Sequence, residues 1–436
     1  MRKAALHNLG CKVNSYETEA MQQLLEAAGY EIVPFTEEAD VYIINTCSVT
    51  NIADRKSRQM LHRAKKLNPN GVVVAAGCYV QAAAEELKKD AAVDIIIGNN
   101  KKTELVPILE DYFAGREEDH IIEIGKTREY ETLSISRIAG HTRAFIKVQD
   151  GCNQFCSYCI IPYTRGRVRS RKPEDVVREV ERLVDKGYQE IVLTGIHLSS
   201  YGVDFAEEEK ENLLGLIRRL HPIAGLRRIR LGSLEPRIVT GAFAKALASM
   251  EKICPHFHLS LQSGCDATLK RMNRHYTTAE YEERCKILRK AFDNPAITTD
   301  VIVGFPGETE EEFAQTKEYL ERIHFYEMHI FKYSKRAGTR AAVMEDQVPE
   351  QVKAARSDVL LALEREMSGQ YRDSQTGLLK DVLLEEKLTV DGTDYMVGHT
   401  KEYVKVVVPY SENRKNQMAV GRIGQKLTEE ILTLEE

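Results

Sequence analysis

Three cysteines in the middle of the chain have a spacing that suits an iron–sulfur cluster. Cys152, Cys156 and Cys159 stand in the run CNQFCSYC, directly after a predicted strand over residues 144–149. A cluster of four irons normally takes four thiolate ligands, so three cysteines would leave one iron with an open position. The amino and carboxylate groups of S-adenosylmethionine can fill that position. An electron delivered through the cluster would break the sulfonium bond, so the motif predicts a site that generates a deoxyadenosyl radical.

Other metal and redox sites explain this spacing less completely. Tetrahedral zinc needs a fourth cysteine or histidine with its own spacing, and the sequence has none close by. Cys156 and Cys159 alone are typical of a thioredoxin-like pair, but that interpretation leaves Cys152 without a role. A passive electron carrier normally supplies all four ligands. The radical-generating cluster is the interpretation that uses all three cysteines.

A second group of cysteines is scattered through the first eighty residues. Cys11, Cys47 and Cys78 each follow a short apolar run. Residues just past the carboxyl ends of parallel strands meet at one edge of an open sheet, where such folds bind ligands. We therefore expect these cysteines to hold a second cluster with one open iron. The alternative is burial as small apolar side chains, which is our expectation for the three later cysteines, Cys254, Cys265 and Cys285.

The first predicted domain, residues 1–115, alternates short apolar runs with helical patterns. Near-continuous apolar strands separated by helices are typical of a parallel, doubly wound sheet. The helical patterns begin near Asn14, Ile52, Val80 and Thr103. The expected strands are residues 3–10, 31–35, 39–46, 71–77 and 93–98.

The second predicted domain, residues 138–368, repeats a strand and a helix six times. Helix-start signals support this reading, because Pro173 suits a first turn and Thr309 with Glu312 forms a capping box. Six such units make a partial, TIM-like (β/α)6 barrel, whose chemistry lies at the C-terminal ends of its strands. The expected strands are residues 144–149, 190–195, 228–233, 256–261, 298–305 and 326–334.

The third predicted domain, residues 371–436, is a small closed β-barrel. A single helix over residues 349–372 is expected to connect it to the second domain. Short strands divided by the turns DGTD and SENRKN are typical of barrels that bind oligonucleotides. The whole chain is thus predicted to be an α/β protein with a doubly wound sheet, a partial barrel and a small β-barrel.

Composition places the chain among ordinary globular proteins. Its 436 residues exceed what one core usually organises, and 43% hydrophobic with 29% charged residues excludes global disorder. The N-terminus lacks the apolar region of a secretory signal, and no apolar run approaches the ~20 residues that cross a bilayer. Nine clustered cysteines do not suit a disulfide scaffold. We therefore expect a cytoplasmic monomer with no membrane partner.

Basic side chains gather directly after the central cysteine motif. Residues 162–172 include five basic and no acidic side chains, and residues 55–66 also lack acidic ones. Clustered arginine and lysine indicate phosphate binding, although a charge run is also common on a solvated face. The position beside the cysteines favours RNA, and the candidate contacts are Arg165, Arg167, Arg169, Arg171 and Lys172.

The C-terminal segment does not share this positive charge. Residues 371–436 contain nine Lys or Arg against twelve Asp or Glu, which excludes a uniformly basic clamp. RNA binding there would use a local face that combines charge with aromatic stacking. The candidates for that face are Lys401, Lys405, Arg414, Lys415, Tyr403 and Tyr410.

The Cys-x3-Cys-x2-Cys spacing, with Tyr158 before the last cysteine, resembles the radical S-adenosylmethionine superfamily. LTGI (193–196), GSLEP (232–236), LSLQSG (259–264) and DVIVGFPGE (300–308) resemble segments of the same superfamily. The resemblance implies that backbone groups of Tyr158 meet the adenine of the cofactor. It also implies that polar residues at strand ends line the cofactor or the radical path, while the alternative is that they only tie loops together. These residues are Thr194, Ser233, Glu235, Gln262 and Asp300.

NLGCKVN, INTCSVT and AAGCYVQ resemble the N-terminal domain of radical methylthiotransferases. The segments PYTRG (162–166) and KYSKRAGTRA (332–341) do so as well, and the C-terminal barrel resembles a TRAM domain, an RNA-binding module. The resemblance covers essentially the whole chain and is strongest to the branch that acts on threonylcarbamoyladenosine in tRNA.

This resemblance implies a reaction in two stages that uses two [4Fe-4S] clusters and S-adenosylmethionine. One S-adenosylmethionine methylates sulfur carried on the auxiliary cluster at Cys11, Cys47 and Cys78. Another is cleaved at the central cluster, and the radical removes hydrogen from the adenine carbon between the two pyrimidine-ring nitrogens. The implied partners are tRNA with threonylcarbamoyl-adenosine next to the anticodon and a low-potential electron donor of the flavodoxin or ferredoxin type.

Two alternatives stay open. The same chemistry could act on isopentenyl-adenosine in tRNA or on an aspartate of a ribosomal protein. A protein of another class, a non-catalytic RNA-binding protein with structural zinc, would also show basic runs and clustered cysteines. Iron and labile sulfide in the purified protein would distinguish the enzyme from that alternative.

Overall fold

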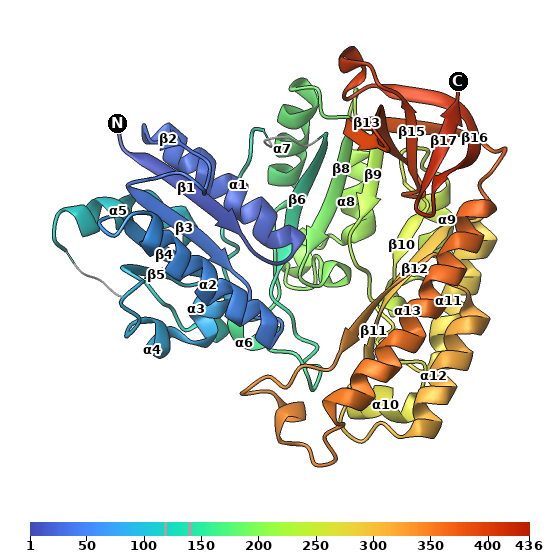
Figure 1. Ribbon diagram of the computed structural model, residues 1–436, viewed down its shortest axis with the longest axis horizontal. Helices are drawn as coiled ribbons and strands as arrows, with labels where there is room; N and C mark the ends of the chain where they lie inside the picture. Colours follow the sequence, from blue (N-terminus) through green and yellow to red (C-terminus); the bar gives the residue numbers. More distant parts are fainter. Residues whose placement is uncertain (117–119, 138–141) are drawn as a thin grey trace.

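The computed structural model describes residues 1–116, 120–137 and 142–436, and it confirms the predicted α/β class (Figure 1). A parallel N-terminal sheet, a partial barrel and a small closed barrel follow one another along the chain. Residue 138, where we predicted the second domain to begin, lies outside the described residues. Among the helices of the described segments, none is long and apolar enough to cross a membrane.

The N-terminal sheet has the strand order β2-β1-β3-β4-β5. Apolar side chains fill both faces, since Ile43 and Tyr42 belong to two different apolar clusters on opposite sides of β3. This double burial explains the near-continuous apolar strands. The strands are β1 (Lys3–Asn8), β2 (Glu31–Ile32), β3 (Val41–Thr46), β4 (Val72–Gly77) and β5 (Ile95–Ile97). The helices are α1 (Lys12–Ala27), α2 (Asn51–Leu67), α3 (Cys78–Ala82), α4 (Ala84–Leu87), η1 (Lys102–Glu104), α5 (Leu105–Phe113) and η2 (Ile124–Lys126).

The partial barrel contains six parallel strands, with β7 (Arg169–Ser170) added antiparallel to the first of them. Isolated bridges such as Leu234↔Leu259 join the segment after β9 to the segment after β10 and connect the two sheets of the barrel. The parallel strands are β6 (Arg143–Asp150), β8 (Glu190–Gly195), β9 (Arg228–Leu231), β10 (His256–His258), β11 (Ala296–Val303) and β12 (Glu327–Lys332).

Helices cover the outer face of this barrel. Thr277 and Thr309 each cap a helix in a capping box, as the sequence predicted for Thr309. The longer helices are α7 (Pro173–Asp185), α8 (Leu213–Leu220), α9 (Gly241–Ala248), α11 (Thr278–Ala291) and α12 (Glu310–Ile323). The short ones are α6 (Ile161–Thr164), η3 (Leu198–Ser200), η4 (Glu207–Glu209), η5 (Pro236–Ile238), α10 (Asp266–Arg271) and η6 (Arg340–Val343).

The C-terminal strands close into a barrel in the order β13-β14-β15-β17-β16. The connecting helix α13 (Glu350–Asp373) agrees closely with the predicted helix. The strands are β13 (Leu379–Val390), β14 (Thr393–Thr400), β15 (Lys405–Pro409), β16 (Met418–Thr428) and β17 (Ile431–Glu435), with η7 (Glu412–Arg414) between the third and fourth. Arg228 and Arg230 fasten this barrel to the core, because their guanidinium groups donate to the carbonyl oxygens of Asp381, His399, Thr400 and Lys401.

Candidate active site at two cysteine trios

The central cysteines lie in the loop that follows β6. The Cys152 N–H donates to the Gly166 carbonyl at 3.0 Å, and the Cys159 N–H donates to the Cys156 carbonyl at 3.0 Å. Ser157 ties the loop to the end of α10, since its N–H donates to the Met272 carbonyl at 2.9 Å. The loop is therefore held by its own turns and by a neighbouring helix.

Arg274 is a functional candidate that sequence reasoning missed. Its Nη1 donates to the Cys156 sulfur at 3.2 Å, and its Nη2 donates to the Ser260 carbonyl at 3.2 Å. Asn273, beside it, donates to the Phe155 carbonyl at 3.0 Å. No spacing relates residue 274 to the cysteine motif, so only the folded chain shows that this cation borders the cluster loop.

The other three cysteines stand at the carboxyl ends of adjacent parallel strands. Cys11 precedes α1 directly after β1, Cys47 follows β3, and Cys78 opens α3 after β4. The first two border the switch point between β1 and β3, which is where doubly wound sheets bind ligands. Burial raises the pKa of Cys47, and the nearby Cys78 and Cys11 raise it further. The three thiols thus lie within electrostatic reach of one another.

Two glycines permit this approach. Gly10 has φ +103°, and a Cβ there would lie 2.8 Å from the Cys47 sulfur. Gly77 has φ +99°, and a Cβ there would lie 2.6 Å from the side-chain oxygen of Asn45. Because other residues rarely adopt this conformation, the glycine before Cys11 and the glycine before Cys78 both serve the site.

Polar groups surround the sulfur of Cys78. Arg165 Nε donates to it at 3.2 Å, and Asn99 Nδ2 lies 3.6 Å away. The same guanidinium donates from Nη2 to Asn14 Oδ1 at 2.6 Å. Donors to sulfur and a nearby cation suit an anionic cluster that cysteine ligands hold.

Arg165 also lies in a buried ion network between the N-terminal sheet and the core. It pairs with Glu17 of α1 at 2.8 Å and with Asp150 of β6 at 3.2 Å. Lys147 pairs with both carboxylates, each at 2.7 Å. Although burial alone would raise it, the pKa of Glu17 is held well below its usual range by Arg165, Lys102 and Lys147. This network of ion pairs holds the N-terminal trio of cysteines (the second trio) against the loop that follows the central trio (the first trio).

This burial corrects one of our sequence predictions. Arg165, Arg169 and Arg171 are at most 2% exposed, and Arg171 pairs with the buried Glu179. Their guanidinium groups are engaged by protein carboxylates, so the prediction that they bind phosphate is wrong. A charge run in the sequence cannot distinguish a solvated face from one that faces carboxylates of another segment.

In neither cysteine trio do all three sulfur atoms lie within 4.8 Å of one another. Thiolates that bind zinc at ~2.3 Å lie ~3.8 Å apart by tetrahedral geometry. Within the described residues, only His258, Asp300 and His329 bring three potential ligand atoms within 4.8 Å of one another. A cluster whose thiolates attach to different irons fits the wider spacing. Burial raises the pKa of Cys152 and of Cys47 to about 11, so these thiols need a bound metal to hold them as thiolates near neutral pH.

Comparison with known proteins shows the family. Residues 146–320 match the radical SAM superfamily, and residues 3–98 match a family described as uncharacterized protein family UPF0004. The threonylcarbamoyladenosine tRNA methylthiotransferase MtaB of Bacillus subtilis is 43% identical over 95% of this chain and 92% of its own length. The chain belongs to the radical S-adenosylmethionine methylthiotransferase family.

Relatives that are named for a different nucleoside are also similar to this chain. The tRNA-2-methylthio-N(6)-dimethylallyladenosine synthase of Carboxydothermus hydrogenoformans is 36% identical over 95% of this chain and 94% of its own length. The radical S-adenosylmethionine methyltransferase TsrM from Kitasatospora setae has a TM-score of 0.58 at 16% identity, over 78% of this chain and 74% of that one. This last likeness shows the fold alone. The protein is thus an enzyme of a class that uses S-adenosylmethionine and a [4Fe-4S] cluster.

Most residues expected near S-adenosylmethionine lie at or just beyond the carboxyl ends of core strands, whereas Asp300 lies within β11. Thr194 is buried at the end of β8, whereas Ser233 is exposed after β9. The backbone N–H of Gln262 donates to the Asp300 carbonyl at 2.8 Å, which holds these two side by side. Glu235 is engaged by Arg237 at 2.7 Å, and the Tyr158 ring packs against Phe305 at 6.4 Å. Their contacts with the cofactor stay predictions.

A small basic and aromatic surface borders the central cysteine loop. Arg167 lies over the Phe155 ring at 4.6 Å, and the 49% exposed Tyr163 packs on the same ring. Lys172, five residues after Arg167, is exposed. Arg167 and Lys172 are therefore the two members of the predicted RNA-binding run that solvent can reach. Helix α2 adds other exposed basic side chains, among them Arg55, Lys56 and Arg63.

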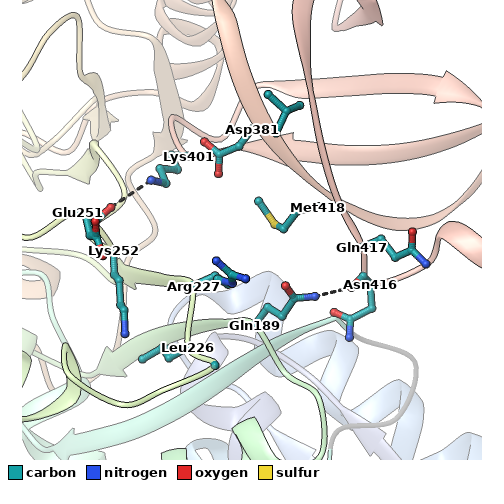
Figure 2. A pocket seen from close by; sticks show the side chains of 12 residues that line it. Gln189, Leu226, Arg227, Glu251, Lys252, Asp381, Lys401, Asn416, Gln417 and Met418 are labelled. Carbon is teal, nitrogen blue, oxygen red and sulfur yellow. Dashed lines mark hydrogen bonds between the residues drawn. The ribbon is translucent and has the colours of Figure 1, made fainter. Parts of the chain in front are cut away.

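The C-terminal barrel lies against the opposite end of the core strands. A groove of about 770 Å³ separates it from residues that precede β8 and β9, and Figure 2 shows Arg227, Lys252 and Lys401 around it together with Glu251 and Asp381. The mixed signs give this groove no strong preference for phosphate.

Tyr403 does not face outward from this barrel. Its ring stacks on His399 at 4.5 Å and lies within 4.8 Å of the guanidinium groups of Arg143 and Arg230. The expectation that Tyr403 stacks on RNA is therefore wrong, because its ring faces the core. Tyr410, which is 39% exposed, retains an accessible ring.

Proposed function

We propose that this enzyme methylthiolates threonylcarbamoyl-adenosine next to the anticodon of tRNA. Cys152, Cys156 and Cys159 hold the cluster that cleaves S-adenosylmethionine, and the trio Cys11, Cys47 and Cys78 holds a second [4Fe-4S] cluster that carries the sulfur. When bound, the clusters and S-adenosylmethionine supply the deoxyadenosyl radical and the methylthio group. This division of labour needs both sites to open toward one substrate.

One observation carries the proposal. Arg165 follows Cys159 by six residues in sequence, yet its guanidinium donates to the sulfur of Cys78 and pairs with Glu17 of α1. The loop after the central motif is therefore fastened directly to the second trio. A substrate atom at the mouth of one site is then near the other, as a reaction that combines a radical with a sulfur group requires.

Two observations support tRNA with this nucleoside as the substrate. Relatives at 43% identity in Bacillus subtilis and 42% in Aquifex aeolicus are named for this nucleoside, while the dimethylallyladenosine relative is 36% identical. Arg167, Lys172 and the exposed side of α2 offer cations for the RNA backbone. Dimethylallyl-adenosine in tRNA is the second candidate substrate.

Two features of the working enzyme complete the proposal. Reductive cleavage needs an electron at low potential, toward the negative end of the range that clusters cover, so we propose a donor of the flavodoxin or ferredoxin type. We also propose that the enzyme acts as a monomer, since the chain supplies both trios itself.

Mass spectrometry of tRNA nucleosides tests the assignment. Deleting the gene in its source organism should remove methylthio-threonylcarbamoyl-adenosine and leave its unmethylthiolated precursor. A plasmid copy should restore the product, while a Cys47→Ala copy should not. If the deletion removed methylthio-dimethylallyl-adenosine and left the first product unchanged, the second candidate would replace the proposal.

A further inference from the structure

The inner face of the partial barrel is polar. Along β10, β11 and β12 the residues Phe257, Val301 and Met328 pack outward into the apolar core under the helices. Because side chains alternate along a strand, the intervening residues face inward. On these three strands the inward positions include His258, Asp300 and His329, and His329 is exposed although it lies on the inner face. An inner face of this kind suits a polar ligand.

These three side chains differ in the hydrogen bonds that they form. His258 donates or accepts at both ring nitrogens, with Nδ1 3.0 Å from Thr298 Oγ1 and Nε2 3.2 Å from Asp300 Oδ2. His329 pairs with Asp300 in the strand register and stacks on the His258 ring at 5.8 Å. Over the described residues, His329 has no hydrogen bond from its ring nitrogens. The His329 imidazole lies near the carboxylate of Glu327, two residues before it on β12, but donates no hydrogen bond to it. Its ring nitrogens can therefore still donate to a ligand, while Asp300 is occupied by His258.

A lysine from the N-terminal sheet joins this face. Lys12, the first residue of α1, follows Cys11, and its Nζ lies 6.0 Å from the centre of the Phe145 ring on β6. Figure 1 shows α1 alongside β6. Phe145 is an inward residue, because Ala144 and Ile146 pack outward. Lys12 thus reaches from the second trio toward the inner face of the core.

Lys12 has a carboxylate in its neighbourhood but forms no ion pair with it within the described residues. Its charged neighbours are Arg230, Arg143 and Glu190, but Glu190 is taken by Arg230 at 2.8 Å and Arg143 pairs with Glu385 at 3.1 Å. Lys12 is exposed and forms no ion pair within the described part of the chain. A cation that lies beside other cations, and whose neighbouring carboxylate is already paired, is a candidate binding group for an anion.

We infer that Lys12 and His329 receive the carboxylate of the threonylcarbamoyl group on the target adenosine. The inference rests on the proposed function, since it needs the base to lie between the two cysteine trios. Threonine that is linked through its nitrogen keeps an ionised carboxylate, whereas a dimethylallyl group carries no charge and no hydrogen-bonding atom. The lysine ammonium and an imidazole N–H are donors that suit the first group and would stay unpaired beside the second.

Binding of anticodon stem-loop RNAs to the cluster-loaded enzyme tests this inference without turnover. Three otherwise identical RNAs carry threonylcarbamoyl-adenosine, dimethylallyl-adenosine or unmodified adenosine, and fluorescence anisotropy measures each affinity. The wild-type enzyme should bind the first RNA roughly tenfold more tightly than the unmodified one, as a charge-assisted hydrogen bond allows. Lys12→Met and His329→Phe should each remove most of that preference, and Lys12→Arg should keep it.

Controls keep the outcomes distinct. Cluster absorbance and iron content show whether Lys12→Met still assembles the site beside Cys11. The preference is measured as the ratio of the affinities for the modified and unmodified RNAs, so that a general loss of RNA binding is not counted as a loss of preference. If both variants kept the wild-type preference, the inference would be overturned. A preference that chelation abolishes while Lys12→Met retains it would assign His258, Asp300 and His329 to a metal ion instead. If the wild-type enzyme formed no methylthio product on the first RNA, the proposed function itself would fail.

Discussion

The two cysteine trios are assembled in opposite ways. Cys152, Cys156 and Cys159 occupy eight consecutive residues of one loop, whereas Cys11, Cys47 and Cys78 come from the ends of three strands. The first trio belongs to one loop, which its own turns and the end of α10 hold. The second exists only when the parallel sheet has formed and when glycines allow close approach, as Gly10 does beside Cys47. The spacing within one loop thus predicts where the radical forms. Assembly of the trio that would carry the sulfur depends on the topology of the sheet.

Each trio also has an arginine that donates to one sulfur, but the two arginines have different origins. Arg274 comes from the core that carries its cysteine loop, and it donates to Cys156. Arg165 comes from the core too, yet it donates to Cys78 of the N-terminal sheet. The second site therefore depends on contact between two parts of the chain. Substitutions can separate the sites, because their supports are different.

The largest expected effect is that of Cys156→Ala. Removal of one thiolate from the central loop should abolish both deoxyadenosine formation and methylthiolation, since no radical is generated. Iron should fall from about eight to about four atoms per chain if the second cluster stays intact. Chromatography of deoxyadenosine and iron analysis check this result. A variant that still cleaved S-adenosylmethionine would break the assignment of the central trio.

Cys47→Ala should affect only the transfer of the methylthio group. Cleavage of S-adenosylmethionine should continue, because the central loop and Arg274 are unchanged, while the methylthio product disappears. Deoxyadenosine and modified nucleosides are measured in the same reaction, with the wild-type enzyme as the reference. Loss of cleavage in a folded Cys47→Ala protein would show that the two trios do not function separately.

Arg165→Met should weaken the contact between the two sites. The substitution leaves Glu17 and Asp150 buried with fewer partners, and breaking a buried ion pair costs about 3–5 kcal/mol. Urea unfolding followed by circular dichroism measures the loss. Arg178→Met is the matched control, because Arg178 pairs with Asp175 on the surface, where a pair contributes about 0–1 kcal/mol. Equal losses in both variants would contradict the structural role of Arg165.

Sequence reasoning predicted the fold class and all the main strands because apolar runs of parallel sheets are easy to recognise. It also placed Cys11, Cys47 and Cys78 at strand ends, from the same runs. It failed for Arg165, Arg169 and Arg171 because a run of basic residues does not show which carboxylates the folded chain brings against it. Glu17, a partner of Arg165, lies more than a hundred residues away, while the other partners belong to a neighbouring strand and helix. Arg274 was missed for the same reason. Contacts between distant segments depend on the topology, which local patterns do not contain.

The smallest expected effect concerns the exposed members of the basic run. Arg167→Met with Lys172→Met should weaken binding of the tRNA and leave stability nearly unchanged, since both side chains reach solvent. If each makes one contact with the phosphate backbone, the slope of log affinity against log salt concentration should fall by about 0.7–0.9 per contact. Arg169→Met should instead destabilise the protein and keep the slope, because its guanidinium is buried beside Asp150. Affinities measured at several salt concentrations separate the two behaviours. An unchanged slope in the double variant would move the RNA-binding surface elsewhere, with the exposed side of α2 as the next surface to test.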